Sequence, residues 1–224
     1  MDSDSKLISF SYYILRKIFG PIIRIIWVKK VTGLENIPKS GSAILVFNHQ
    51  SFFDFLCFVA VSPRNVHFLS AEKFFNHKLW KHLMRWTGQI KVERQAHDKG
   101  GVHDLVKKHI DKGTLIGIFP EGTRSPHQHE MLKAFTGAGR YSLEHRVPII
   151  PIGIKGTFEI NSRDSKKVLY KKFAELHIGK PLHFTEHYGR HAEKDICTLV
   201  TEKAIKEIEK LSGKKYPHYE FNHE

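Results

Sequence analysis

Short apolar segments alternate with segments of helical periodicity from residue 30 onward, and this alternation narrows the possible folds more than any other feature. The strand-like segments are Lys30–Leu34, Ala43–Phe47, Val66–Leu69, Gln89–Glu93, Leu115–Phe119, Ile149–Ile154 and Glu175–Ile178. The helix-like segments lie near Phe52–Ala60, Phe74–Thr87, Val102–Lys112, Gly137–His145 and Glu193–Leu211. A helix between two strands returns the chain to the end at which the first strand began, so such strands pair in parallel. The sequence therefore predicts an α/β fold: one domain, residues 30–224, with a mostly parallel central sheet flanked by helices, and loops at 157–174 and from Gly213 onward.

An apolar segment precedes this domain. Residues 7–28 are rich in large apolar side chains and are interrupted by three basic residues, Arg16, Lys17 and Arg24. We expect Gly20-Pro21 to break the segment into two pieces, each shorter than the roughly 20 residues that a spanning helix needs. In the first piece the apolar residues recur at helical spacing: Leu7, Phe10, Ile14, Leu15 and Ile18. Residues 1–29 are therefore expected to form two amphipathic helices in the membrane interface, with the basic residues near lipid headgroups. The other interpretation is that this stripe packs on the protein's own core.

The charge of the chain indicates which classes of partner to consider. There are 36 basic and 23 acidic residues, giving a formal net charge of +13. Such a chain is attracted to polyanions, which include nucleic acids, anionic membrane surfaces and phosphorylated ligands. Lys and Arg are scattered and the recognised nucleic-acid-binding motifs are missing, so we expect no nucleic acid as a partner. The two cysteines, Cys57 and Cys197, are too few for a disulfide framework and fit a reducing compartment.

A histidine and an aspartate follow the second apolar strand. The run is Asn48-His49-Gln50-Ser51-Phe52-Phe53-Asp54, and Ser51-x-x-Asp54 has the form of a helix capping box. Because residues five apart do not share a helix face, His49 is expected in the turn ahead of the helix, beside the Asp54 carboxylate. There His49 can accept a proton from a hydroxyl while Asp54 fixes its tautomer and stabilises the imidazolium.

A second polar turn, Pro120-Glu121-Gly122-Thr123-Arg124-Ser125, follows the apolar strand Leu115–Phe119. Gly122 permits an unusual backbone conformation, Thr123 provides a hydroxyl, and Arg124 can bind a phosphate with two parallel hydrogen bonds. Both turns follow a predicted strand, and parallel sheets bind their ligands beyond the carboxyl ends of the strands. The two motifs together indicate an enzyme that acts on a phosphorylated acceptor.

With these motifs the sequence resembles the glycerophospholipid acyltransferases, and most closely the group that acylates 1-acylglycerol-3-phosphate. Four blocks carry the resemblance: Asn48-His49-x-Ser51-x-x-Asp54, Gly88-x-Ile90-x-Val92-x-Arg94, Phe119-Pro120-Glu121-Gly122-Thr123-Arg124-Ser125 and Val147-Pro148-Ile149-Ile150-Pro151. The resemblance implies that His49 and Asp54 are the catalytic pair. It also implies that the glycerol phosphate of the acceptor is bound by Arg94, Glu121, Gly122, Thr123 and Arg124, with Lys73 at a position where the family often has lysine. In one departure, Phe135 stands before Thr136-Gly137 where many members have lysine, and Lys133 lies nearby.

The resemblance implies that a hydroxyl of lysophosphatidic acid, deprotonated by His49, attacks an acyl thioester and gives phosphatidic acid. The acyl donor is then acyl-CoA or acyl carrier protein, no cofactor is needed, and the enzyme is membrane-associated with its site on the cytoplasmic face. No Gly-x-Ser-x-Gly motif is present to suggest an acyl-enzyme. Acyl transfer to another lysophospholipid or to a glycolipid precursor remains an alternative.

A metal-dependent phosphoesterase, with His49 and Asp54 as ligands, is the other enzyme class to weigh. The chain has 16 histidines, and His127-x-His129 and His145 raise the question of a metal site. The polar neighbours of His127 and His129 are more typical of a solvated loop, and His-Glu-x-x-His and paired-cysteine spacings are missing. We therefore expect no metal.

Overall fold

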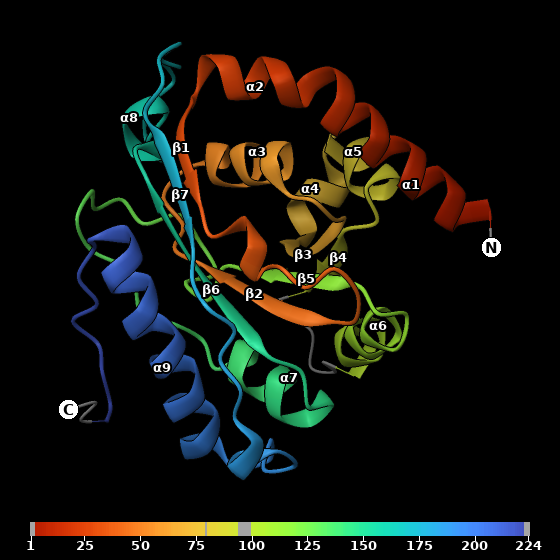
Figure 1. Ribbon diagram of the computed structural model, residues 1–224, viewed down its shortest axis with the longest axis vertical. Helices are drawn as coiled ribbons and strands as arrows, with labels where there is room; N and C mark the ends of the chain where they lie inside the picture. Colours follow the sequence, from red (N-terminus) through yellow and green to blue (C-terminus); the bar gives the residue numbers. More distant parts are fainter. Residues whose placement is uncertain (1–2, 79, 94–99, 222–224) are drawn as a thin grey trace.

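The computed structural model describes residues 3–78, 80–93 and 100–221, and they form an α/β domain around one seven-stranded sheet (Figure 1). The strands are β1 (Val28–Thr32), β2 (Ala43–Phe47), β3 (Val66–Ala71), β4 (Ile90–Val92), β5 (Leu115–Ile118), β6 (Ile149–Lys155) and β7 (Ala174–Ile178). Their order in the sheet is β1-β7-β6-β2-β5-β3-β4. Neighbouring strands are parallel except for β6 and β7, which are antiparallel. The expected single α/β domain with a mostly parallel sheet is confirmed.

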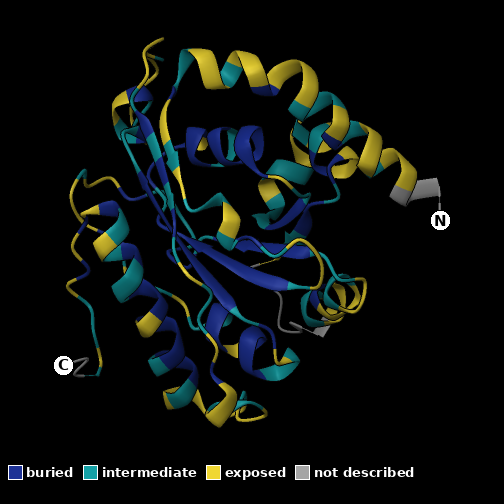
Figure 2. Cartoon of the chain, viewed as in Figure 1, coloured by how far each residue is buried: buried dark blue, intermediate teal, exposed yellow. Residues whose placement is uncertain are grey.

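The strand β2 lies at the centre of the sheet and is buried along its whole length. A central strand of a parallel sheet is covered on both faces, which explains its uninterrupted apolar sequence. Its side chains alternate between two cores: Ala43, Leu45 and Phe47 contribute to one, and Ile44 and Val46 to the other. Figure 2 shows the central strands β2, β5 and β6 in the dark blue of buried residues, whereas the edge strand β1 is mostly exposed or intermediate.

Helices cover both faces of the sheet (Figure 1). Residues from α3 (Phe52–Val61) and from the N-terminal segment complete the first core. The second core is completed by residues of α6 (Gly100–Asp111), α7 (Gly137–His145) and α9 (Lys194–Ser212). Because β2 and β5 are adjacent and parallel, the loops that follow them leave the sheet side by side at the carboxyl ends of the two strands. The fold thus brings together the two motifs, which are some 70 residues apart in the sequence.

Some element boundaries differ from the expected ones. The expected helix Phe74–Thr87 is divided into α4 (Glu72–Asn76) and α5 (Trp80–Trp86), because the backbone of His77 is extended and ends the first helix. The expected loop at 157–174 begins with a short helix, α8 (Thr157–Ile160). β1 begins two residues before the expected strand, because Val28 already pairs with Ala174 of β7.

The N-terminal segment is helical from Ser3 to Ile26, and the expected break at Gly20-Pro21 is wrong. It consists of α1 (Ser3–Ile14), a π-helical turn (Leu15–Phe19) and α2 (Gly20–Ile26). The Gly20 N–H donates to the carbonyl of Leu15, five residues earlier. A proline within a helix lacks an N–H and crowds the carbonyl four residues before it. The wider π turn directly before Pro21 leaves room for that ring, so the helical path continues.

One side of the N-terminal segment is packed against the domain. Tyr12 is buried, its hydroxyl donates to the carbonyl of Val66, and it accepts a hydrogen bond of 3.2 Å from the Gln89 side-chain amide. Arg16 donates to the carbonyl of Pro63 at 2.9 Å and to the side chain of Asn65 at 2.6 Å. Arg16 therefore binds the protein.

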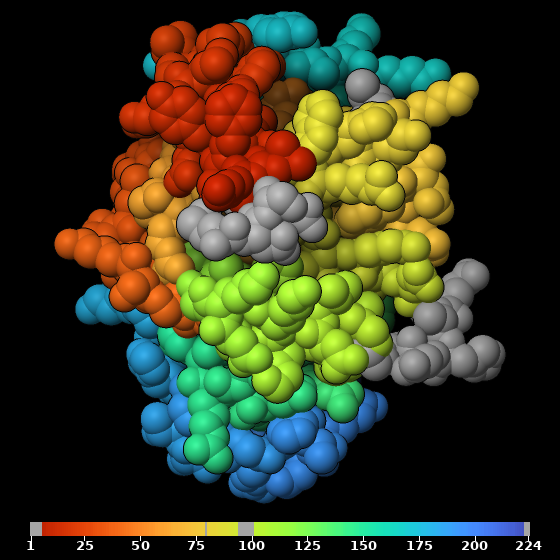
Figure 3. All heavy atoms as spheres, turned by 90° about the vertical axis from the view of Figure 1, so that its right-hand side faces the viewer, coloured from red at the N-terminus to blue at the C-terminus, as the bar shows by residue number. Residues whose placement is uncertain are grey.

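The opposite side of the N-terminal segment exposes seven large apolar or aromatic side chains, which we call the apolar face: Leu7, Phe10, Tyr13, Ile18, Phe19, Ile22 and Ile25. The exposed fraction of these residues reaches 68% at Ile25. Figure 3 shows the segment in red on the surface of the molecule, beside α5 in yellow. Of the expected stripe, Leu15 packs on the core, whereas Leu7, Phe10 and Ile18 are exposed. In the described part of the chain, none of the helices has the length and apolar character needed to cross a bilayer.

Candidate active site

Ser51 caps the N-terminus of the helix α3. The Ser51 hydroxyl accepts a hydrogen bond of 3.2 Å from the Phe53 N–H and donates to the carbonyl of Asn161. Asp54 lies at the third position of the helix and accepts the N–H of Ser51 at 2.9 Å, which completes the expected capping box. His49 lies outside the helix, in the turn between β2 and Ser51, as its spacing from Asp54 requires.

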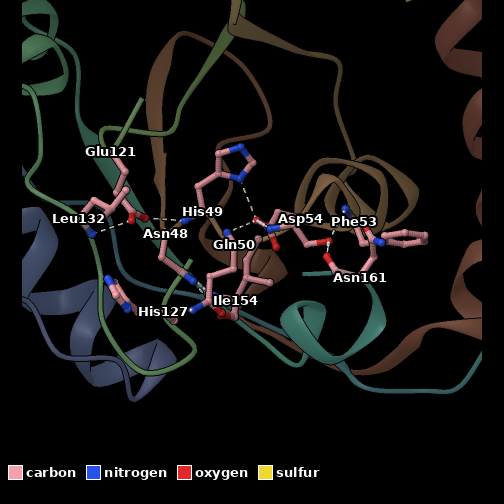
Figure 4. Close-up of polar contacts among 11 residues, drawn as sticks. Asn48, His49, Gln50, Phe53, Asp54, Glu121, His127, Leu132, Ile154 and Asn161 are labelled. Atoms are coloured by element: carbon pink, nitrogen blue, oxygen red, sulfur yellow. Dashed lines mark hydrogen bonds and ion pairs between the residues drawn. The ribbon is translucent and has the colours of Figure 1, made fainter. Parts of the chain in front are cut away.

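The His49 imidazole and the Asp54 carboxylate are hydrogen-bonded, with 2.9 Å between Nδ1 and Oδ2 (Figure 4). The same Asp54 oxygen accepts the Gln50 N–H at 2.7 Å, and the Asp54 side chain is fully buried. A carboxylate oxygen only accepts hydrogen bonds, so His49 Nδ1 carries the proton and Nε2 is the nitrogen that faces a substrate. The ring is held in this orientation by Phe119, whose centroid lies 4.0 Å from that of His49 in a stacked arrangement.

The backbone of His49 is bound by the second motif. Its N–H donates to Glu121 Oε1 at 2.6 Å, and its carbonyl accepts the N–H of Ser125 at 2.7 Å. The other Glu121 oxygen accepts the Leu132 N–H at 2.8 Å (Figure 4). Glu121 is only 3% exposed, and this burial raises its pKa to about 8 although both backbone hydrogen bonds favour the ionised form. Both oxygens of Glu121 are directed to backbone N–H groups, and Glu121 is not among the residues that line the cavity described below.

The end of the second motif is arranged around Gly122 and Arg124. Gly122 has a φ of 65°, in the left-handed region that favours glycine, as expected. The Arg124 guanidinium carbon lies 4.0 Å above the centre of the Phe52 ring, a distance typical of a cation–π contact. Partial burial and the nearby charge of Arg163 lower the pKa of Arg124. Arginine remains charged in proteins, so this site carries a fixed positive charge.

These groups line a cavity of about 570 Å³ in front of His49. Such a volume is typical of small-molecule sites. Its lining includes apolar and aromatic side chains, among them Phe55, Leu56, Phe68, Met84 and Ile118. It also includes the cations Lys73, Arg124, Arg140 and Arg163. A molecule with an anionic head and a long apolar chain matches both kinds of lining residue.

Most of the expected site residues lie at this cavity. His49, Lys73, Gly122, Thr123 and Arg124 line it, while Asp54 lies behind His49. Arg94 falls outside the described residues. Sequence reasoning missed Arg140 and Arg163, which belong to none of the motif blocks, and also the ring stacking between Phe119 and His49.

The departure at Phe135 also has a structural consequence. Phe135 lines the cavity and its side chain is 69% exposed. Lys133 forms an ion pair of 2.8 Å with Glu220 and is not among the cavity-lining residues. The wall therefore presents an aromatic ring at this position.

His127, His129 and His145, which raised the question of a metal site, do not line this cavity. His127 and His129 are exposed in the loop after the second motif, in agreement with a solvated loop. Over residues 3–78, 80–93 and 100–221, no three His, Cys, Asp or Glu side chains are grouped closely enough to hold a metal ion.

Comparisons with known proteins indicate the family of the chain. A family model described as Acyltransferase matches residues 29–155. The 1-acyl-sn-glycerol-3-phosphate acyltransferase of Bacillus subtilis is 24% identical over 187 residues, which are 83% of this chain and 88% of that protein. The chloroplastic 1-acyl-sn-glycerol-3-phosphate acyltransferase LPAT1 of Arabidopsis thaliana is 30% identical over 158 residues, 68% of this chain but 43% of the plant protein. The chain therefore spans less than half the length of that relative.

A solved structure has the same fold. It is the crystal structure of the 1-acyl-sn-glycerophosphate acyltransferase PlsC from Thermotoga maritima. The TM-score is 0.72 at 22% sequence identity, over 94% of this chain and 83% of that chain. The family model covers more than half of the 224 residues and includes both motifs. The chain therefore belongs to the acyltransferase family.

Proposed function

We propose that the protein transfers a fatty acyl group from an acyl thioester to the free hydroxyl of 1-acylglycerol-3-phosphate, giving phosphatidic acid. The observation that carries this proposal is the hydrogen-bonded His49–Asp54 pair at a cavity lined by both cationic and apolar side chains. The names of the relatives from Bacillus and Arabidopsis support the same acceptor.

In the proposed reaction His49 is the general base. Its Nε2 accepts the proton of the acceptor hydroxyl while the hydroxyl oxygen attacks the thioester carbonyl. Asp54 is buried and accepts a hydrogen bond from the Nδ1–H group of His49. Its negative charge therefore stabilises the imidazolium that forms. The tetrahedral oxyanion then collapses, the carbon–sulfur bond breaks and the thiolate leaves. The imidazolium proton is available to the departing sulfur.

The wall of the cavity orients the acceptor in this proposal. Arg124 and Lys73 face the phosphate, because both are cations at the cavity and Arg124 is fixed over the Phe52 ring. The acyl chain lies against the aromatic and aliphatic part of the wall. Glu121 acts on His49 rather than on the acceptor, through the hydrogen bond to the His49 N–H.

The surface of the molecule supports a proposal for its partners and its location. We propose that the apolar face of the N-terminal segment lies in an anionic membrane surface, because seven large apolar side chains are exposed on one side of it. Lys17 and Arg24, both exposed on the same segment, suit lipid headgroups. The acyl donor is acyl-CoA or acyl carrier protein, anionic carriers that match the net charge of +13. The active site then faces the cytoplasm, a reducing compartment that suits the two free, buried cysteines.

The test is thiol release from an acyl thioester, measured with and without 1-acylglycerol-3-phosphate, for the wild type and for His49→Ala. We expect release that depends on the acceptor and falls by about 10²- to 10⁴-fold in the variant, the usual contribution of a general base. His129→Ala is the matched control, because His129 is exposed and does not line the cavity. Release that does not need the acceptor would indicate a thioesterase and contradict the proposal.

A further inference from the structure

Arg163 lies at the cavity although no motif contains it. It follows α8 in the segment 161–173, lines the same wall as Arg124, and its side chain is otherwise exposed. Its guanidinium donates a hydrogen bond of 3.2 Å to the backbone carbonyl of Arg124. This bond connects a loop after β6 to the turn after β5 and holds the Arg163 guanidinium at the backbone of Arg124. The two side chains are close enough for the charge of Arg163 to lower the pKa of Arg124.

Arg124 and Arg163 are both positively charged, and within the described part of the chain no nearby carboxylate neutralises either guanidinium group. Among the described residues, no carboxylate lies within 4.0 Å of the charged nitrogens of either Arg124 or Arg163. Asp54 and Asp164 favour the charged form of Arg124 only from a greater distance. Two neighbouring cations repel each other, and a bound anion between them would replace that repulsion by attraction.

We infer that Arg163 and Arg124 together bind the phosphate of the acceptor, and that Arg163 selects a phosphate monoester over a phosphate diester; this inference rests on the proposed function. A monoester carries a charge between about −1.5 and −2 near neutral pH, because its second pKa is about 6. A diester, as in lysophospholipids with a larger head group, carries a single negative charge. Two guanidinium groups match the monoester in charge and in number of donors. One guanidinium is sufficient for the diester.

The experiment compares the wild type with Arg163→Ala and Arg163→Lys in initial rates on two acceptors. The first acceptor is 1-acylglycerol-3-phosphate and the second is 1-acylglycerophosphoglycerol, whose phosphate is a diester. For Arg163→Ala we expect the KM for the monoester to rise about tenfold or more, which is typical of losing a charge-assisted hydrogen bond. The kcat, the KM for the thioester and the rate with the diester should change less than about threefold. Arg163→Lys should restore part of the loss, because it keeps the charge without the fork of donors.

Lys166→Ala is the matched control, since Lys166 is an exposed cation in the same loop. An unchanged KM for the monoester in Arg163→Ala, or equal increases for the monoester and the thioester, would overturn the inference. Equal increases for both acceptors would overturn the proposed selectivity.

A second readout does not depend on catalysis. The melting temperature of the wild type should rise with sn-glycerol 3-phosphate and should rise less in Arg163→Ala, since a ligand stabilises the state that binds it. No rise in the wild type, or the same rise in the variant, would contradict the assignment of Arg163. A wild type that binds sn-glycerol 3-phosphate through Arg163 but transfers no acyl group would instead contradict the proposed function.

Discussion

At the scale of single residues, the position of His49 depends on Glu121. The Glu121 carboxylate accepts one backbone N–H from His49 and one from Leu132. A side chain in this position fixes the peptide that carries the base, and shifts of about 1 Å at a reacting group are known to reduce rates by about 10²-fold. Glu121 is thus a positioning residue, and its loss should affect catalysis rather than binding.

We therefore predict that Glu121→Gln lowers kcat at least about tenfold and leaves the KM for the acceptor within about threefold. A glutamine side chain has one acceptor oxygen, so one of the two buried backbone N–H groups loses its partner, at a cost of about 1–3 kcal/mol in the free energy of unfolding. Glu130→Gln is the control, because Glu130 is exposed in the loop that follows this turn. If Glu121→Gln instead raised the KM for the acceptor and left kcat unchanged, Glu121 would be a residue that binds the acceptor.

The pH dependence of stability gives an independent check on Glu121. Its pKa of about 8 in the folded chain lies above its ordinary value of 4.5. Between these values the unfolded chain has lost the proton and the folded chain still holds it, so a rise in pH favours unfolding. The fall in the free energy of unfolding from pH 5 to pH 8 should therefore be smaller in Glu121→Gln than in the wild type. Parallel curves for the two proteins would contradict the raised pKa.

At the scale of elements, two histidines join β3 to α6. The ring centroids of His67 and His109 lie 4.2 Å apart, and His67 Nδ1 is 2.6 Å from the carbonyl oxygen of Gly88. Burial lowers the pKa of both, and that of His109 falls to about 4, with the charge of His67 as a further cause. The contact therefore joins two neutral rings at neutral pH, and acid should weaken it.

We predict that the free energy of unfolding falls as the pH drops from about 6.5 towards 4, and that His109→Gln reduces this fall. In this interval the unfolded chain takes up a proton at residue 109 and the folded chain does not, so acid favours unfolding. His129→Gln serves for comparison, because His129 is exposed. Denaturant titrations at several pH values measure the effect, and an equal acid sensitivity in all three proteins would contradict it.

Elements whose boundaries are set locally were predictable. β2 and α7 have the expected limits, because a continuous apolar run defines the first and a glycine begins the second. The continuous path through Pro21 was not predictable, because it depends on tertiary packing. Gly20 lies so close to the backbone of Ala60 that a Cβ at this position would be 3.3 Å from the Ala60 carbonyl oxygen, and Tyr12 is anchored at Val66.

In the candidate site, too, the residues in local motifs were predictable and those placed by tertiary structure were not. The motifs identified His49, Asp54 and Arg124, because their chemistry can be inferred from residue type and spacing. The role of Glu121 was hidden, because its partners are backbone groups, which any sequence provides. Arg163 was hidden because it comes from a loop that only the folded sheet brings to the cavity.

At the scale of the whole molecule, the apolar face of the N-terminal segment is the surface on which the proposed membrane binding depends. Because the other side of the segment is packed, truncation would expose the core, and charged substitutions are the better test. We predict that Ile18→Glu with Ile22→Glu lowers binding to vesicles that contain anionic lipid by about tenfold or more, since each buried side chain contributes about 1.5–3 kcal/mol. Flotation of the protein with vesicles measures this.

The matched control is Leu105→Glu, because Leu105 is an exposed apolar residue on α6. The double variant should also lose activity on acceptor embedded in vesicles and keep activity on acceptor dispersed in detergent. If the double variant floated with vesicles as well as the wild type does, the apolar face would not be the membrane-binding surface.

The hydrogen bonds around the His49 peptide also limit how this enzyme can be recombined. His49 receives its partners from Glu121 and Ser125, whereas the residues between the two motifs contribute none of these bonds. In a chimera with a relative, a length change within either turn would displace the base even if every catalytic side chain were retained. The two turns therefore have to be exchanged together. Chimeras that receive both turns from one relative should be active, and chimeras that receive only one of them should not.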